Sequence, residues 1–135
     1  MNIPPRDIDS EPLRGYCAAD ARILAAYLFG SHAHGTARAD SDVDIGLLLD
    51  RDLALAEELA LRAAIAQWLK LDDVDLVLLR GASALLRYEA MVRGKRLYAR
   101  DPVLVDELEA RATMEYFDTA YFREVQQRLM RESLA

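Results

Sequence analysis

The chain has 135 residues, enough for one domain with a buried core, and we expect residues 1–135 to form one. Hydrophobic residues make up 53% of it, but no apolar run approaches the length of about 18 residues that suggests a membrane span. Its 23 acidic and 17 basic residues give a net charge of −6, which argues against direct nucleic-acid binding, because such binding depends on Lys and Arg neutralising phosphates.

The N-terminal residues and the single cysteine indicate a compartment. The opening stretch "MNIPPRDIDSEPL" lacks the basic-then-apolar order of a secretory signal. Cys17 has no second cysteine to pair with inside the chain, which fits a reducing compartment. We therefore expect a cytoplasmic protein in which Cys17 is a buried apolar residue on a short helix.

The first half of the chain predicts two strands joined by a loop. A short helix is expected over 12–22, then a buried strand over 23–30 and a second strand over 43–49. Asp42 and Asp44 stand at the start of the second strand. Buried strands avoid carboxylates, so these two need a compensating charge.

A helix is predicted over 52–70, with Asp52 as its N-cap and Trp68 in the core. Its apolar residues recur at helical spacing, and we expect this stripe to face the core: Leu55, Leu59, Ala63, Ala66 and Leu69.

The remaining elements complete an alternating pattern. A third strand is expected over 74–79, and a helix over 83–94 begins at the N-cap Ser83 and stops at Gly94. A short edge strand over 95–99 precedes a long C-terminal helix over about 102–131, with Pro102 in its first turn. The predicted fold class is α/β, with a small mixed β-sheet, helices packed on it, and a core over about 23–98.

Three carboxylates are expected to converge on this sheet. Asp42 and Asp44 are two residues apart on one strand, so their side chains share a face with Cα atoms roughly 7 Å apart. If the second and third strands pair, Asp75 lies about 5 Å away across the sheet. Such a cluster repels itself unless divalent cations bind, and Mg²⁺ prefers carboxylate oxygens together with substrate phosphates. This indicates metal-dependent phosphoryl chemistry.

The loop between the first two strands supplies groups for the phosphates. Gly30 at a strand end lets the backbone approach a ligand, and the Ser31 hydroxyl and N–H can bind phosphate oxygens. Arg38 lies in the same loop, where it could reach a phosphate or remain on the surface. We interpret the loop as the holder of a triphosphate.

These residues resemble a known signature. Gly30-Ser31, ten intervening residues and Asp42-Val43-Asp44 are similar to the motif of the nucleotidyltransferase superfamily that includes DNA polymerase beta. The small size resembles its minimal nucleotidyltransferase branch, the MNT antitoxins paired with HEPN toxins. The resemblance covers most of the chain, from about Ile23 to Tyr98.

The resemblance implies transfer of AMP from ATP with two Mg²⁺ ions and release of pyrophosphate. Gly30 and Ser31 would bind the triphosphate, and Asp42 and Asp44 the metals. Asp75 matches the third carboxylate, which binds a metal and helps to deprotonate the acceptor hydroxyl. In this branch the acceptor is typically a tyrosine of a cognate HEPN ribonuclease, which the modification silences.

His32 and His34 depart from the family pattern, because relatives often have other residues there. A zinc site is the alternative interpretation, but neither a cysteine nor a further histidine completes the ligand set. We interpret them as loop residues.

The C-terminal helix leaves two interpretations open. A stripe at four-residue spacing is expected to pack on the domain: Phe117, Tyr121, Val125 and Leu129. Tyr116 and Phe122 widen the apolar surface, which then also suits docking of a helical partner in a homo-oligomer or hetero-oligomer.

Two other functions are alternatives to the adenylylating antitoxin. A binding-only antitoxin would act by occlusion, although it gains nothing from three repelling carboxylates. A nucleotidyltransferase acting on a small molecule or RNA would need an acceptor site that this short chain could build only between subunits.

Overall fold

Helices and strands alternate along the chain in this computed structural model, which describes residues 10–30, 43–69 and 74–134. In chain order the elements are α1 (Glu11–Ala19), β1 (Ile23–Phe29), β2 (Val43–Leu49), α2 (Leu55–Leu69), β3 (Val74–Leu78), α3 (Ala84–Met91), β4 (Lys95–Ala99) and α4 (Pro102–Leu134). The predicted α/β class is confirmed, and the predicted bounds of β2 and β4 are those observed.

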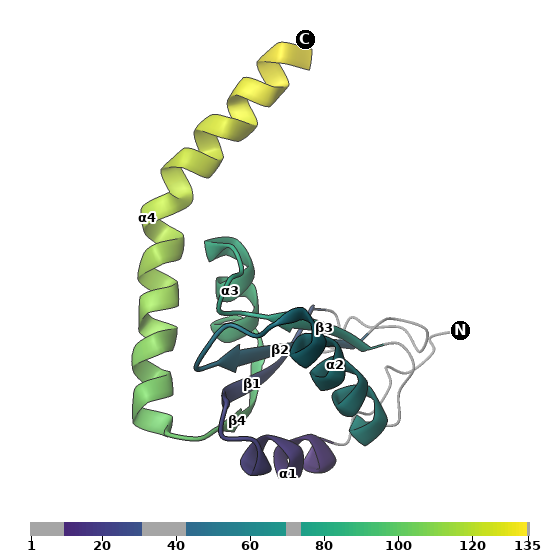
Figure 1. Cartoon of the computed structure of the whole chain (residues 1–135). Helices are drawn as coiled ribbons and strands as arrows, with labels where there is room; N and C mark the ends of the chain where they lie inside the picture. Colours follow the sequence, from purple (N-terminus) through teal and green to yellow (C-terminus); the bar gives the residue numbers. More distant parts are fainter. Residues whose placement is uncertain (1–9, 31–42, 70–73, 135) are drawn as a thin grey trace, which may run out of the picture.

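The strands form one mixed sheet in the order β3-β2-β1-β4 (Figure 1). β1 is antiparallel to both β2 and β4, whereas β2 and β3 are parallel. A parallel pair needs a long crossover, and α2 provides it. The predicted small mixed sheet and the edge position of β4 are both confirmed.

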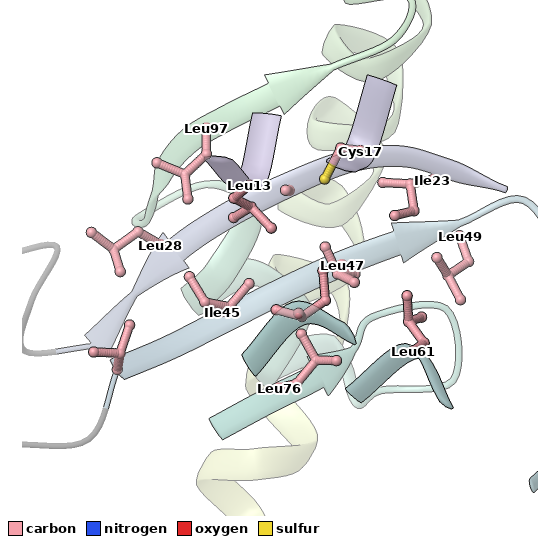
Figure 2. Close-up of a cluster of buried hydrophobic side chains, with 13 residues drawn as sticks. Leu13, Cys17, Ile23, Leu28, Ile45, Leu47, Leu49, Leu61, Leu76 and Leu97 are labelled. Carbon is pink, nitrogen blue, oxygen red and sulfur yellow. The ribbon is translucent and has the colours of Figure 1, made fainter. Parts of the chain in front are cut away.

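One face of the sheet is covered by α1 and α2. Figure 2 shows Leu13 and Cys17 of α1 and Leu61 of α2 gathered over Ile45 and Leu47 of β2. The predicted burial of Cys17 is confirmed, and burial raises the pKa of its thiol to about 12 because the surroundings disfavour the thiolate.

The other face is covered by α3 and α4, and a buried tyrosine fixes α4 to it. Tyr27 of β1 is fully buried, and its hydroxyl donates a hydrogen bond to Glu109 Oε1 of α4 at 2.8 Å. Arg96 of β4 donates to both oxygens of the same carboxylate, at 3.1 and 2.7 Å. Burial and the neighbouring Glu109 raise the pKa of Tyr27, so the hydroxyl keeps its proton.

Local capping interactions explain where the helices begin. The Ser83 hydroxyl accepts a hydrogen bond from the Leu86 N–H at 3.1 Å, so the predicted cap of α3 is confirmed. The predicted cap of α2 is wrong, because α2 begins only at Leu55 and Asp52 instead accepts a hydrogen bond from Arg80. Glu57, in the first turn of α2, accepts one from the Ala54 N–H just before the helix.

The buried face of α2 also differs from the predicted one. Leu61 and Ile65 are buried, and Trp68, predicted to be in the core, is 47% exposed. Most of the predicted stripe is exposed: Leu55, Leu59 and Ala63. Leu and Ala occur on every side of this helix, so helical spacing fits more than one stripe. The crossover between two parallel strands determines which stripe faces the sheet.

The first half of α4 lies beside α3, and its second half extends away from the sheet (Figure 1). The predicted packing of its stripe is therefore wrong for Tyr121 and Leu129, which are 68% and 59% exposed. Phe117 is 62% exposed, and its ring contacts Tyr88 of α3 edge-on. Beyond Phe117 the helix makes no hydrogen bond, ion pair or ring contact with another element in the described part of the chain. No helix in the described part of the chain has an apolar stretch long enough to cross a membrane.

Candidate functional site

Three candidate residues lie together where β1 ends and β2 and β3 begin. Gly30 follows β1 directly, and Asp44 and Asp75 are the second residues of their strands. Asp44 pairs with Phe29 of β1 on one side and with Asp75 of β3 on the other. The predicted pairing of the second and third strands is thus confirmed, and adjacent strands lie about 4.8 Å apart.

Gly30 and the Asp44 side chain are packed so closely that only glycine fits. Gly30 has a φ of +73°, in the left-handed region that glycine adopts without strain. A Cβ added there would lie 2.3 Å from Asp44 Oδ2 and 3.3 Å from its Cγ. The turn after β1 is therefore shaped around the carboxylate, and both belong to one local arrangement.

The two described carboxylates differ in exposure. Alternation along β2 places Asp44 on the sheet face of Leu48, which packs with α3 and α4, and Asp44 is half-buried there. Asp75 is exposed. Both offer hard oxygen ligands of the kind that Mg²⁺ prefers, one backed by protein and one open to a second molecule. The donor set therefore fits a divalent cation.

The other predicted site residues lie outside the described residues: Ser31, Arg38 and Asp42, together with His32 and His34. Their roles stay predictions. Within ranges 10–30, 43–69 and 74–134 no group of three metal-ligating side chains is close enough to hold an ion. A complete metal centre thus requires a ligand from elsewhere, and Asp42 is the predicted one.

A positioning residue that the sequence analysis missed supports the end of β1. A Cβ on Gly94 would lie 2.8 Å from the Leu28 carbonyl oxygen and 2.2 Å from that of Ala90. Gly94 therefore allows the turn between α3 and β4 to lie directly against β1, two residues before Gly30. In the sequence it is recognisable only as a helix stop, because the contact with Leu28 joins distant segments.

Comparisons with known proteins agree with this geometry. Residues 11–103 match the family described as "Polymerase beta, Nucleotidyltransferase". The protein adenylyltransferase MntA of Shewanella oneidensis is 37% identical over 96 residues, 71% of this chain and 67% of that protein.

Solved structures of toxin–antitoxin systems are also similar. One toxin–antitoxin structure with AMP-PNP matches with a TM-score of 0.74 and 25% identity, covering 95% of this chain and 100% of that one. A tri-AMPylated HEPN toxin of Shewanella oneidensis in complex with MNT antitoxin matches with a TM-score of 0.61 and 27% identity, covering 87% and 88% of the two chains.

Proposed function

Because the chain belongs to the polymerase beta nucleotidyltransferase family, we propose that it transfers AMP from ATP to a tyrosine hydroxyl of a HEPN-type toxin and thereby neutralises that toxin. The similar protein from Shewanella oneidensis is named a protein adenylyltransferase, and a similar solved structure pairs an MNT antitoxin with an AMPylated HEPN toxin. The family resemblance inferred from the motif residues is thus confirmed.

The observation that carries this proposal is the pairing of Asp44 with Asp75 beside the tight Gly30 turn. Asp42, Asp44 and Asp75 would hold two Mg²⁺ ions, which neutralise the charge on the phosphates when bound. The backbone at Gly30 can approach a triphosphate closely. Ser31 and Arg38 would bind phosphate oxygens in the same loop.

The exposed position of Asp75 suits a contact with the acceptor. The tyrosine oxygen would attack the α-phosphorus of ATP, and the bond from that phosphorus to the α,β-bridging oxygen would break. Pyrophosphate leaves, and Asp75 accepts the hydroxyl proton at one of its carboxylate oxygens. Asp44, half-buried and fixed against Gly30, would hold metal rather than exchange protons.

The remaining parts of the proposal concern organisation. Residues 1–135 would form a single minimal nucleotidyltransferase domain that works in the cytoplasm, where ATP and a ribonuclease target are both present. The exposed apolar residues on the second half of α4 would dock the partner.

The test is intact mass spectrometry of the toxin after incubation with the protein, ATP and Mg²⁺. We expect a gain of one or more AMP groups with the wild type and none with Asp44→Asn. Glu107→Gln is the matched control, because Glu107 is an exposed carboxylate on α4 outside the candidate site, and it should transfer normally.

Two results would redirect the proposal. A toxin whose mass stays unchanged with the wild type, but which is still inhibited by Asp44→Asn, would favour a binding-only antitoxin. Transfer of AMP to RNA or to a small molecule, with none to the toxin, would favour a different acceptor class.

A further inference from the structure

A pocket of about 240 Å³ lies between α3, α4 and the sheet, far from the candidate active site. Apolar side chains line it, among them Leu24 of β1, Leu48 of β2 and Met91 of α3. Leu48 is four residues along β2 from Asp44, so the pocket is roughly 13 Å from the catalytic edge at the usual strand rise. None of the residues that line the pocket takes part in the proposed transfer reaction.

The polar lining of this pocket consists of three arginines and one carboxylate, that of Glu115, so its charge is only partly neutralised. Arg87 of α3 is bonded to Glu115 of α4, but its Nε is buried without a hydrogen-bond partner. Arg111 of α4 makes no hydrogen bond or ion pair with any described residue. Arg80 also lines the pocket and is held by Asp52. Arg111 therefore keeps accessible donors in a protein whose net charge is −6.

The pocket's chemistry and size define the ligand. Guanidinium donors bind carboxylates or phosphates, and the apolar lining favours an uncharged group beside that anion. The pocket volume of about 240 Å³ is below the range of about 300–1,000 Å³ that is typical of small-molecule sites. It suits one or two side chains better than a nucleotide.

An exposed apolar side chain on the same face of α4 extends the apolar lining of the pocket. Leu104 lies one turn before the pocket residue Leu108 and is 38% exposed. An apolar hollow with charged groups at its rim resembles the centre and rim of a protein–protein interface.

We propose that this pocket docks the protein partner, with an apolar side chain over Leu48 and Met91 and a neighbouring carboxylate paired with Arg111. The identity of the partner as a HEPN-type toxin rests on the proposed function. The acidic and apolar character of the docking segment rests on the pocket alone.

The test measures the affinity of the full-length protein for the toxin, without ATP, at low and at physiological salt. Arg111→Glu should weaken binding at least tenfold and reduce its salt dependence, and Arg111→Gln should weaken it less. Arg51→Glu makes the same charge change at an exposed side chain outside the pocket and should bind within twofold of wild type. Thermal unfolding should be unchanged in both Arg111 variants, since Arg111 has no partner among the described residues.

Binding of Arg111→Glu within twofold of wild type would overturn the proposal, as would a wild type that does not bind the toxin. Saturable binding of inorganic phosphate or AMP that is lost in Arg111→Glu, with unchanged affinity for the toxin, would overturn it in favour of a small-anion site. AMP transfer is measured separately by mass. A wild type that binds through Arg111 but transfers nothing would therefore contradict the proposed function and leave the docking site supported.

Discussion

The Asp44 carboxylate occupies the space that a side chain at position 30 would need, so only glycine fits there. Gly30→Ala would place a Cβ 2.3 Å from Asp44 Oδ2 on a backbone with φ of +73°. We expect AMP transfer to fall at least tenfold and stability to fall by about 1–2 kcal/mol, because left-handed backbone is costly for alanine. Intact mass of the toxin and urea unfolding measure the two effects.

Gly15→Ala is the matched control for that substitution. Gly15 lies inside α1 with no atom near its added Cβ, so alanine there should stabilise the protein by about 0.5–1 kcal/mol and leave transfer unchanged. Normal transfer by Gly30→Ala would show that the turn and Asp44 do not act together.

The buried thiol of Cys17 makes stability depend on pH. Its pKa is raised to about 12, whereas the unfolded thiol titrates near 8.5. Above that pH the unfolded chain loses a proton that the folded protein keeps, so folding is disfavoured as pH rises. Between pH 8 and 9.5 we expect wild type to lose about 1 kcal/mol relative to Cys17→Ala.

Urea unfolding of both proteins across this range is the measurement. Parallel pH profiles for the two proteins would mean that the thiol ionises without unfolding, and that it is not enclosed by α1 and the sheet.

At the scale of elements, α2 has one buried apolar stripe, with Leu61 and Ile65, and one exposed apolar stripe, with Leu55 and Leu59. Ile65→Ala should cost about 2–5 kcal/mol, because it leaves a cavity against the sheet. Leu59→Ala removes a side chain that is 57% exposed and should cost less than about 0.5 kcal/mol. Equal costs in chemical denaturation would mean that the stripe first predicted from the sequence also packs.

This example shows what the sequence could predict about the elements. Their order, type and approximate bounds follow from local patterns, as with β2 and the Ser83 cap of α3. The face that α2 buries depends instead on a crossover between strands, and several apolar stripes on one helix cannot indicate it. The length of α4 also follows from a local pattern. That its second half extends away from the sheet does not, because this depends on where the other elements end.

The hydroxyl of Tyr27 in β1 joins α4 to the sheet through its hydrogen bond to Glu109. Tyr27→Phe removes a 2.8 Å hydrogen bond to Glu109, although Arg96 still satisfies that carboxylate. We expect a loss of about 1 kcal/mol in unfolding free energy. Tyr121→Phe, at a tyrosine that is 68% exposed, should change nothing. No loss in Tyr27→Phe would mean that Arg96 and packing alone position α4.

At the scale of the whole molecule, residues from separate segments come together. The sequence predicts such a meeting only where a simple pairing rule connects the segments. Alternation and strand pairing are simple rules, so the sequence alone predicts that Asp44 lies beside Asp75, as it does in the structure. The pocket with Arg80, Arg87 and Arg111 is assembled from three separate segments, and each arginine alone reads as an ordinary solvated residue. Sites built across distant helices have no local signature.

The long α4 separates folding from docking along one helix. Its last described contacts with another element involve Glu115, which binds Arg87, and Tyr116 and Phe117, which contact Tyr88. The Tyr116 ring stacks on Tyr88 at a centroid distance of 3.9 Å. Beyond Phe117, α4 makes no hydrogen bond, ion pair or ring contact with another described element.

A chain that ends at Asp118 should therefore keep its fold. We expect its unfolding free energy to stay within about 0.5 kcal/mol of wild type, because the removed side chains Tyr121, Phe122 and Leu129 are mostly exposed. The same truncation should weaken binding to the toxin at least tenfold, since it removes most of the exposed aromatic surface. Urea unfolding and titration calorimetry measure the two properties. A truncated chain that binds normally would confine docking to the arginine pocket, and one that unfolds would mean that the distal helix stabilises the domain after all.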